Sequence, residues 1–250
     1  MTLKKGTWFI PVVCLSLLAM GGAARAADNP SIEPRAERIL KAAIANLHEA
    51  KSYRFRGEMI NDILLPGGSR MELVSTVQGA VRRPDRAWTR VEGEGRKSGE
   101  WYDGKTFTHL DLASNAYASW AAPATIDELL DKIKEKLGFV PPMAPLLRGT
   151  VNQEAMKTIQ SGVYVGEAVV GGVPCSHLVF KAENVDWQIY VEKVVPVIKR
   201  FVIVYKKLPG DPKFGITFTQ WDFNTTLPDF VFAFDPPPGA TKVEFEIVQQ

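Results

Sequence analysis

The sequence predicts a mainly antiparallel β fold with a few helices, an α+β protein built on a strongly curved sheet or barrel. Segments of alternating apolar and polar residues recur through most of the chain, which is the pattern of strands with one buried face. Short turn signals such as Asp103-Gly104 and Gly171-Gly172 separate these segments and favour hairpins. Residues 70–83 would span roughly 45 Å as one strand, and strands of that length are typical of curved sheets.

The expected strands share this alternation and are bounded by turn-forming residues. The first contains Tyr53, Phe55 and Met59, and the others cover residues 70–83, 86–94, 97–102, 106–110, 116–120, 163–170, 173–181, 185–192, 197–205 and 214–223. These segments give about eleven strands with short antiparallel connections.

Two helical regions accompany the strands. From Ala36 the apolar residues recur at helical spacing, so we expect an amphipathic helix that ends near Ala50 and lies on the sheet. Thr125 is suited to cap a second helix that Gly138 ends, and residues 152–160 have the pattern of another short helix. The sequence therefore predicts a helical insertion at about residues 123–160.

The first 26 residues have the features of a secretory signal peptide. Lys4 and Lys5 precede the apolar run Trp8–Met20, and Ala24–Ala26 is suited to cleavage. The apolar run is shorter than the roughly 20 residues of a bilayer-spanning helix, which favours a cleaved signal over a membrane anchor. Cys14 follows Val13 rather than a small residue, so a lipid attachment site is not expected. Residues 27–250 are expected to form one domain that does not span a membrane.

Charge and cysteine content exclude several classes of function. Without Lys4, Lys5 and Arg25, 27 basic residues face 28 acidic ones, and no Lys/Arg cluster remains to bind nucleic acid. Cys175 is the one cysteine left after cleavage, so an intrachain disulfide is not expected and stability must come from the core.

Residues that could carry catalysis are few. His48, His109 and His177 lie outside any zinc-binding spacing, and motifs for phosphate or dinucleotide binding are missing, so neither a metal nor a cofactor is expected. Cys175 and His177 lie two apart on an expected strand and face the same way, which would suit a nucleophilic dyad. A packed cysteine beside a hydrogen-bonded histidine is the more common arrangement.

Two further features have both a functional and a structural interpretation. Asp186 and Asp222 would suit a glycosidase if they faced each other about 5 to 9 Å apart across a cleft, but carboxylates near strand ends are more often solvated. Trp187 would suit a ligand pocket, although an aromatic residue on a strand is more often part of the core.

Five segments carry a family resemblance by their order and spacing: Trp101–Thr106, Gly172–Leu178, Asp186–Tyr190, Phe214–Trp221 and Phe232–Ala240. Together they resemble the predicted periplasmic proteins called domain of unknown function 2092. That family is similar in architecture to the lipoprotein carriers LolA and LolB, an unclosed barrel of about eleven antiparallel strands with a helical lid. The resemblance therefore implies a lipoprotein-carrier-like half-barrel in the periplasm and a lid arginine, for which Arg148 is suggested by its position beside the Pro-rich loop.

The leading hypothesis is a non-enzymatic periplasmic protein that binds or carries an acyl chain, a lipid or a lipoprotein in the half-barrel. The expected lining residues are apolar or aromatic and lie on strands: Tyr53, Phe55, Met59, Met71, Leu73, Val77, Trp187 and Ile189. The partner would be a hydrophobic small molecule or a lipidated protein, with transient membrane contact, and the protein is expected to be a monomer. The alternatives are an envelope interaction or assembly protein with a self-filled barrel, and a hydrolase that uses Cys175 and His177.

Overall fold

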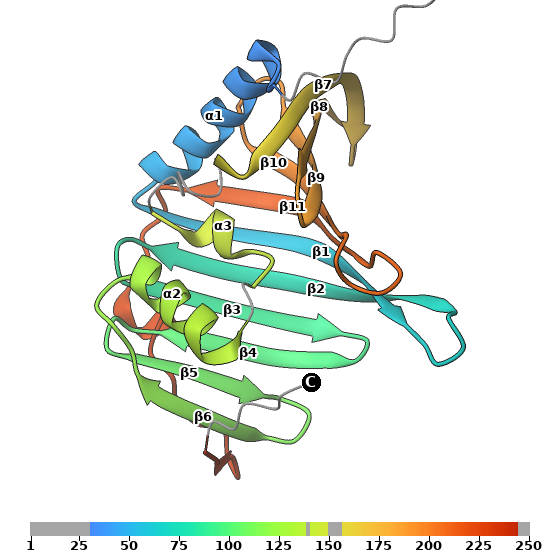
Figure 1. Cartoon of the computed structure of the whole chain (residues 1–250). Helices are drawn as coiled ribbons and strands as arrows, with labels where there is room; N and C mark the ends of the chain where they lie inside the picture. Colours follow the sequence, from blue (N-terminus) through green and yellow to red (C-terminus); the bar gives the residue numbers. More distant parts are fainter. Residues whose placement is uncertain (1–30, 139–140, 150–156, 245–250) are drawn as a thin grey trace, which may run out of the picture.

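The structure is a computed structural model that describes residues 31–138, 141–149 and 157–244. In these residues twelve strands form one sheet, in the order β12-β6-β5-β4-β3-β2-β1-β11-β10-β9-β8-β7 (Figure 1). The strands are β1 (Ser52–Leu64), β2 (Arg70–Arg82), β3 (Arg86–Gly93), β4 (Arg96–Tyr102), β5 (Thr106–Asp111), β6 (Ala116–Ala121), β7 (Ile159–Val170), β8 (Val173–Ala182), β9 (Val185–Glu192), β10 (Ile198–Tyr205), β11 (Lys213–Phe223) and β12 (Thr241–Lys242).

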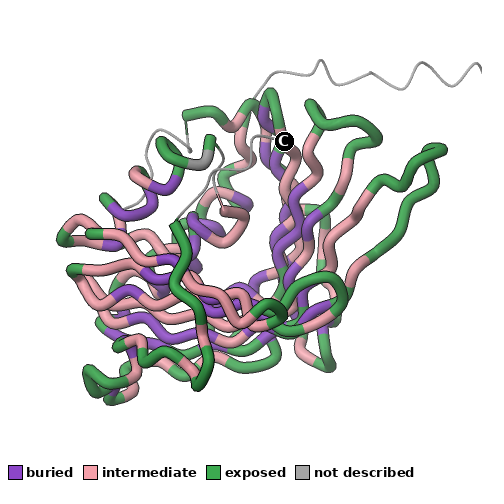
Figure 2. The backbone as a smooth tube through the Cα atoms, turned by 90° about the horizontal axis from the view of Figure 1, so that it is seen from below, coloured by how far each residue is buried: buried purple, intermediate pink, exposed green. Residues whose placement is uncertain are grey.

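Two antiparallel meanders meet in the middle of this sheet. The chain runs from β1 outward to β6, crosses to the opposite edge at β7, and returns strand by strand to β11, which pairs with β1. Within the described residues the edge strands β7 and β12 do not pair with each other, so the sheet stays open. It curves into a trough around the helices (Figure 2). The predicted antiparallel, curved and unclosed sheet is confirmed.

In the described residues three helices lie on the concave side: α1 (Pro34–Glu49), α2 (Ile126–Leu137) and α3 (Ala144–Leu147). The apolar stripe of α1, with Leu40, Ala43 and Leu47, is buried near the β7 end of the sheet (Figure 1). Glu33 is its N-cap and Pro34 occupies the first turn, so the helix begins two residues before Ala36, the first residue of the predicted apolar pattern. Thr125 caps α2 and Gly138 ends it, as predicted.

Two predicted boundaries differ from the structure. The helix expected at 152–160 overlaps β7, because Ile159 and Gln160 already belong to that strand, and residues 152–156 lie outside the described part. β7 therefore begins four residues before the predicted start at Val163. The sequence signal is weak there because Gly162 leaves room for the Phe180 ring, whose Cδ1 lies 2.5 Å from where a Cβ would be. The predicted signal peptide, residues 1–26, also lies outside the described residues.

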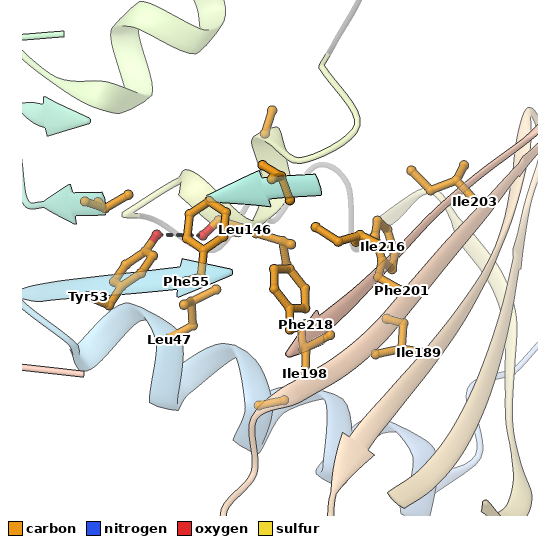
Figure 3. Packing of buried hydrophobic residues seen from close by; sticks show 14 of the residues in the cluster. Leu47, Tyr53, Phe55, Leu146, Ile189, Ile198, Phe201, Ile203, Ile216 and Phe218 are labelled. Carbon is orange, nitrogen blue, oxygen red and sulfur yellow. Dashed lines mark hydrogen bonds between the residues drawn. The ribbon is translucent and has the colours of Figure 1, made fainter. Parts of the chain in front are cut away.

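The core lies between the concave face and the helices (Figure 3). Alternation along β1 points Tyr53, Phe55 and Met59 into it, and the neighbouring strand β11 adds Phe218 and Ile216. Phe55 packs flat across the sheet because Gly79 lies opposite it: a Cβ at Gly79 would come within 2.5 Å of the Phe55 ring.

The convex face is partly covered by a C-terminal strap, residues 225–240, which contains the short 3-10 helix η1 (Asp229–Val231). Leu227 and Phe232 are buried against Ala80, and Phe234 packs against Trp101 with the ring centres 5.0 Å apart. The strap leads to β12, which pairs in parallel with β6. The sequence analysis did not predict this twelfth strand.

Candidate functional site

The eight predicted lining residues all lie on the concave face, in two groups. Those on β1 and β2 are separated from Trp187 and Ile189 on β9 by the intervening strands β11 and β10. Five are buried, namely Tyr53, Phe55, Met59, Val77 and Ile189; Leu73 and Trp187 are half-buried, and Met71 is 41% exposed. In this conformation most of the predicted lining is therefore part of the core.

The sequence analysis missed the residues that join the two groups. Phe214 and Ile216 of β11 and Phe201 and Ile203 of β10 are buried on the same face, so the apolar surface is continuous from β2 to β9 (Figure 3). Their alternation is visible in the sequence. What the sequence does not contain is the position of β11 beside β1.

Aromatic rings concentrate where β1 meets β11. Phe55 contacts Phe218 edge-on at 5.9 Å between ring centres, and Trp221 lies within 6 Å of Tyr53, Phe55 and Phe218. Aromatic pairs in such tilted arrangements add to the stability gained from burial alone. This cluster forms the floor beneath α1 and α3.

Tyrosine hydroxyl groups attach the helical insertion to the sheet. The hydroxyl of Tyr53 donates to the carbonyl of Leu146 in α3 at 3.1 Å (Figure 3). The hydroxyl of Tyr102 donates to the carbonyl of Pro123, just before α2, at 2.6 Å. Burial raises the pKa of Tyr53 far above its ordinary value. Burial, reinforced by the nearby carboxylates Asp85 and Glu128, raises the pKa of Tyr102 to about 12. Both hydroxyls thus remain protonated donors at neutral pH.

Two arginines hold α3. Arg83, at the end of β2, donates from Nη1 to the carbonyl of Leu147 at 2.8 Å. Arg148, which the sequence analysis suggested as the lid arginine, follows α3 and forms an ion pair with Asp131 of α2. Arg148 therefore connects two helices of the insertion, whereas Arg83 connects the insertion to the sheet.

A polar cluster interrupts the concave face on the β3–β5 side. The carboxylate of Glu100 accepts hydrogen bonds from Thr89 at 2.5 Å, Arg96 at 3.0 Å and Ser98 at 3.2 Å, and lies 3.1 Å from Nδ1 of His109. Burial by itself raises the pKa of Glu100, but the hydrogen bond with His109 and the charge of Arg96 outweigh it and lower the pKa below its ordinary value. Glu100 is thus a charged acceptor at neutral pH.

A cavity of about 10 Å³ lies between Leu47 of α1 and Ile198, Trp221 and Phe223 of the sheet. This volume is about that of one water probe, too small for an acyl chain. At this position a long apolar ligand would fit only if α1 moved.

The structure does not support a Cys175–His177 dyad. Cys175 is completely buried. Burial, and to a smaller extent the negative charge of Glu192, raises the pKa of its thiol. A nucleophilic cysteine needs a lowered pKa instead. His177 stacks on Tyr190 at 4.2 Å between ring centres and lies 3.2 Å from the side-chain oxygen of Gln188. These contacts match the packed arrangement rather than the catalytic one.

Asp186 and Asp222 do not form a carboxylate pair across a cleft. In the strand register Asp186 of β9 lies opposite Val204 of β10, which in turn lies opposite Lys213 at the start of β11. Asp222 is near the other end of β11. The two positions are separated by roughly 30 Å along the strands, far beyond glycosidase spacing. Asp186 instead pairs with Lys206 at 2.9 Å. Nowhere in residues 31–138, 141–149 and 157–244 do three or more His, Cys, Asp or Glu side chains gather to hold a metal.

Comparison with known families identifies the group. Residues 36–246 match the predicted periplasmic proteins described as domain of unknown function 2092. The chain belongs to this family. The predicted family and periplasmic location of this member are thereby confirmed. In the described part of the chain, no helix has the length and apolar character needed to cross a bilayer. No curated protein matches the sequence.

The solved structures that this chain matches are distant in sequence. The lipoprotein LprF from Mycobacterium bovis is 13% identical to this chain, with a TM-score of 0.47. The match includes 78% of this chain and 97% of LprF. A LolA superfamily protein from Nitrosomonas europaea is 9% identical to this chain, with a TM-score of 0.37. The match includes 80% of this chain and 97% of that protein. MucB in the Pseudomonas aeruginosa MucA/MucB complex has 14% identity and a TM-score of 0.44. That match includes 80% of this chain, which spans 61% of the length of MucB.

Proposed function

We propose that this protein is a non-enzymatic periplasmic protein that binds an apolar ligand on the concave face of its sheet. The ligand would be an acyl chain, a lipid or the lipid of a lipidated protein. The observation that carries the proposal is the continuous apolar surface from β2 to β9, covered by an insertion that is joined to the sheet through a few side-chain hydrogen bonds.

The helical insertion would act as a lid. The apolar residues Ile126, Leu129, Leu130 and Ile133 of α2 and Leu146 of α3 are buried in the core on the concave side of the sheet. Displacing these side chains exposes apolar surface, so burial of the ligand must compensate for the burial free energy that the lid gives up. At about 0.8 kcal/mol per methylene, a chain of about 16 carbons gives on the order of 12 kcal/mol before ordering costs, which is enough to compete with a short lid.

Two adjacent residues on β2 provide a matched test. Leu73 is half-buried on the concave face, whereas Val74 points to the convex face and is 48% exposed. We expect Leu73→Glu to weaken the binding of a fluorescent fatty acid about tenfold or more, because a carboxylate on the lining opposes an apolar chain. Val74→Glu should leave the affinity unchanged. Equal affinity of the two variants, with both folded, would contradict the proposal.

A second candidate function is an envelope interaction or assembly protein whose half-barrel is filled by its own side chains. The burial of Tyr53, Phe55 and Ile189 favours it, because these expected lining residues already pack against the protein's own side chains. Such a protein would take up no fatty acid at all, and the wild-type titration separates the two functions.

A further inference from the structure

A groove on the convex face lies on the opposite side of the sheet from the lid. Its volume is about 310 Å³, at the lower end of the range for small-molecule sites. The polar residues Arg54, Arg56, Gln78, Gln220 and Asp222 line it together with Trp88. Nothing in the proposed binding of an apolar ligand uses these residues.

The C-terminal strap forms one wall of the groove through Val231. Arg82 fixes this part of the strap, because its Nη1 donates to the carbonyl of Leu227 at 2.6 Å and its Nη2 forms an ion pair with Asp229. Phe232, the residue after Val231, is completely buried. The wall is thus held by a charged anchor on one side and an apolar anchor on the other.

Strand register arranges the polar side chains in two neighbouring rows. Arg56 lies opposite Gln220 on one side and Gln78 on the other, and Arg54 lies opposite Asp222 and Ala80. Because facing residues of antiparallel strands lie about 5 Å apart, the guanidinium, amide and carboxylate groups converge on one small area. Trp88 pairs with Ala80 and extends the second row as an apolar wall.

The two arginines of the groove differ from Arg82 and Arg90 on the same face. Arg82 pairs with Asp229 and Arg90 pairs with Glu92, whereas Arg54 and Arg56 form no ion pair with any residue that the structure describes. With Asp222 as the remaining charge, the lining has two positive groups and one negative group. The groove therefore favours an anion, and guanidinium groups suit a carboxylate because they can donate two parallel hydrogen bonds.

We propose that this groove binds a saccharide that carries a carboxylate, such as a uronic acid. Arg54 and Arg56 bind the carboxylate. The amides of Gln78 and Gln220, together with Asp222, exchange hydrogen bonds with ring hydroxyls, for which both donors and acceptors are required. The side chains of Trp88 and Val231 contact the apolar face of the sugar ring. A simple phosphate or fatty-acid head group would use the arginines and leave the acceptors of the groove without partners.

Calorimetric titration of the full chain with trigalacturonate, and with its methyl ester as the uncharged match, tests this assignment. We expect the acidic sugar to bind and the ester to bind at least about tenfold more weakly. Arg54→Gln and Arg56→Gln should each lower the affinity for the acid about tenfold or more. Arg200→Gln is the matched control, because Arg200 is exposed on the same face of β10, outside the groove, and its replacement should have no effect.

Several outcomes would overturn the assignment. These are no heat of binding at millimolar sugar, equal affinity for acid and ester, or unchanged affinity in both groove variants. Displacement of the sugar by an equal concentration of inorganic phosphate would identify a general anion site without saccharide recognition, which also contradicts the proposal. None of these results bears on fatty-acid uptake at the concave face, so the two sites are tested separately.

Discussion

Glu100 shows how a single residue places charge on a face that is otherwise largely apolar. Its side chain is 19% exposed, yet Thr89, Arg96, Ser98 and His109 surround the carboxylate with hydrogen-bond donors. The sequence analysis considered His109 only as a metal ligand and did not connect it with Glu100. The connection depends on register, because the two residues lie directly opposite each other on β4 and β5.

Replacement of Glu100 by Gln should change how stability depends on pH. Because hydrogen bonds and Arg96 lower the folded-state pKa, the ionised carboxylate stabilises the fold above its unfolded pKa of about 4.3. That stabilisation is lost as the pH falls through the lowered folded-state pKa. We therefore expect wild type to be more stable than Glu100→Gln at pH 7, and the difference in unfolding free energy to shrink below about pH 4.

Urea unfolding of both proteins between pH 7 and pH 3 measures this difference. The other carboxyl groups titrate in both proteins, so subtraction isolates the contribution of Glu100. A difference that stays constant over the whole range would mean that the carboxylate charge does not contribute to the fold.

At the scale of elements, periodicity and turn residues were sufficient for most of the chain. The eleven predicted strands and the helices at α1 and α2 are confirmed, with ends that differ by up to four residues. β12 was missed because two exposed residues carry no alternation. The strap was missed because its anchors, Phe232 and Phe234, lie in a Pro-rich segment, and their contacts with distant strands leave no periodic pattern.

α2 depends on its N-terminal capping box. The hydroxyl of Thr125 accepts from the backbone N–H of Glu128 at 3.2 Å, and the Glu128 carboxylate accepts from the backbone N–H of Thr125 at 3.2 Å. We expect Thr125→Ala to lower the unfolding free energy by about 1 kcal/mol, because it leaves a helix donor without an acceptor.

Thr125→Ser is the matched control, since serine keeps the acceptor, and its stability should lie within about 0.5 kcal/mol of wild type. Hydrogen exchange in the first turn of α2 should accelerate in the alanine variant alone. Unchanged stability and exchange in Thr125→Ala would show that packing, rather than the cap, orders this end of the lid.

At the scale of the whole molecule, the decisive feature is strand order. The sequence analysis placed lining residues on β1, β2 and β9, and all of them lie on the concave face. It did not place Phe201, Ile203, Phe214 and Ile216 between them, because the meeting of β11 with β1 is a long-range pairing that no local pattern specifies. The convex groove was missed for the same reason, since it combines β1, β2, β3 and β11 with the strap.

The proposed binding of an apolar ligand beneath the helical insertion predicts that the protein carries a ligand when it is isolated. Native mass spectrometry of the protein, purified from the periplasm without detergent, measures this occupancy. The account predicts a population whose mass exceeds that of the polypeptide by an acyl chain or lipid, which is lost on collisional activation and restored when palmitate is added. A spectrum of bare polypeptide alone, unchanged by excess palmitate, would contradict it.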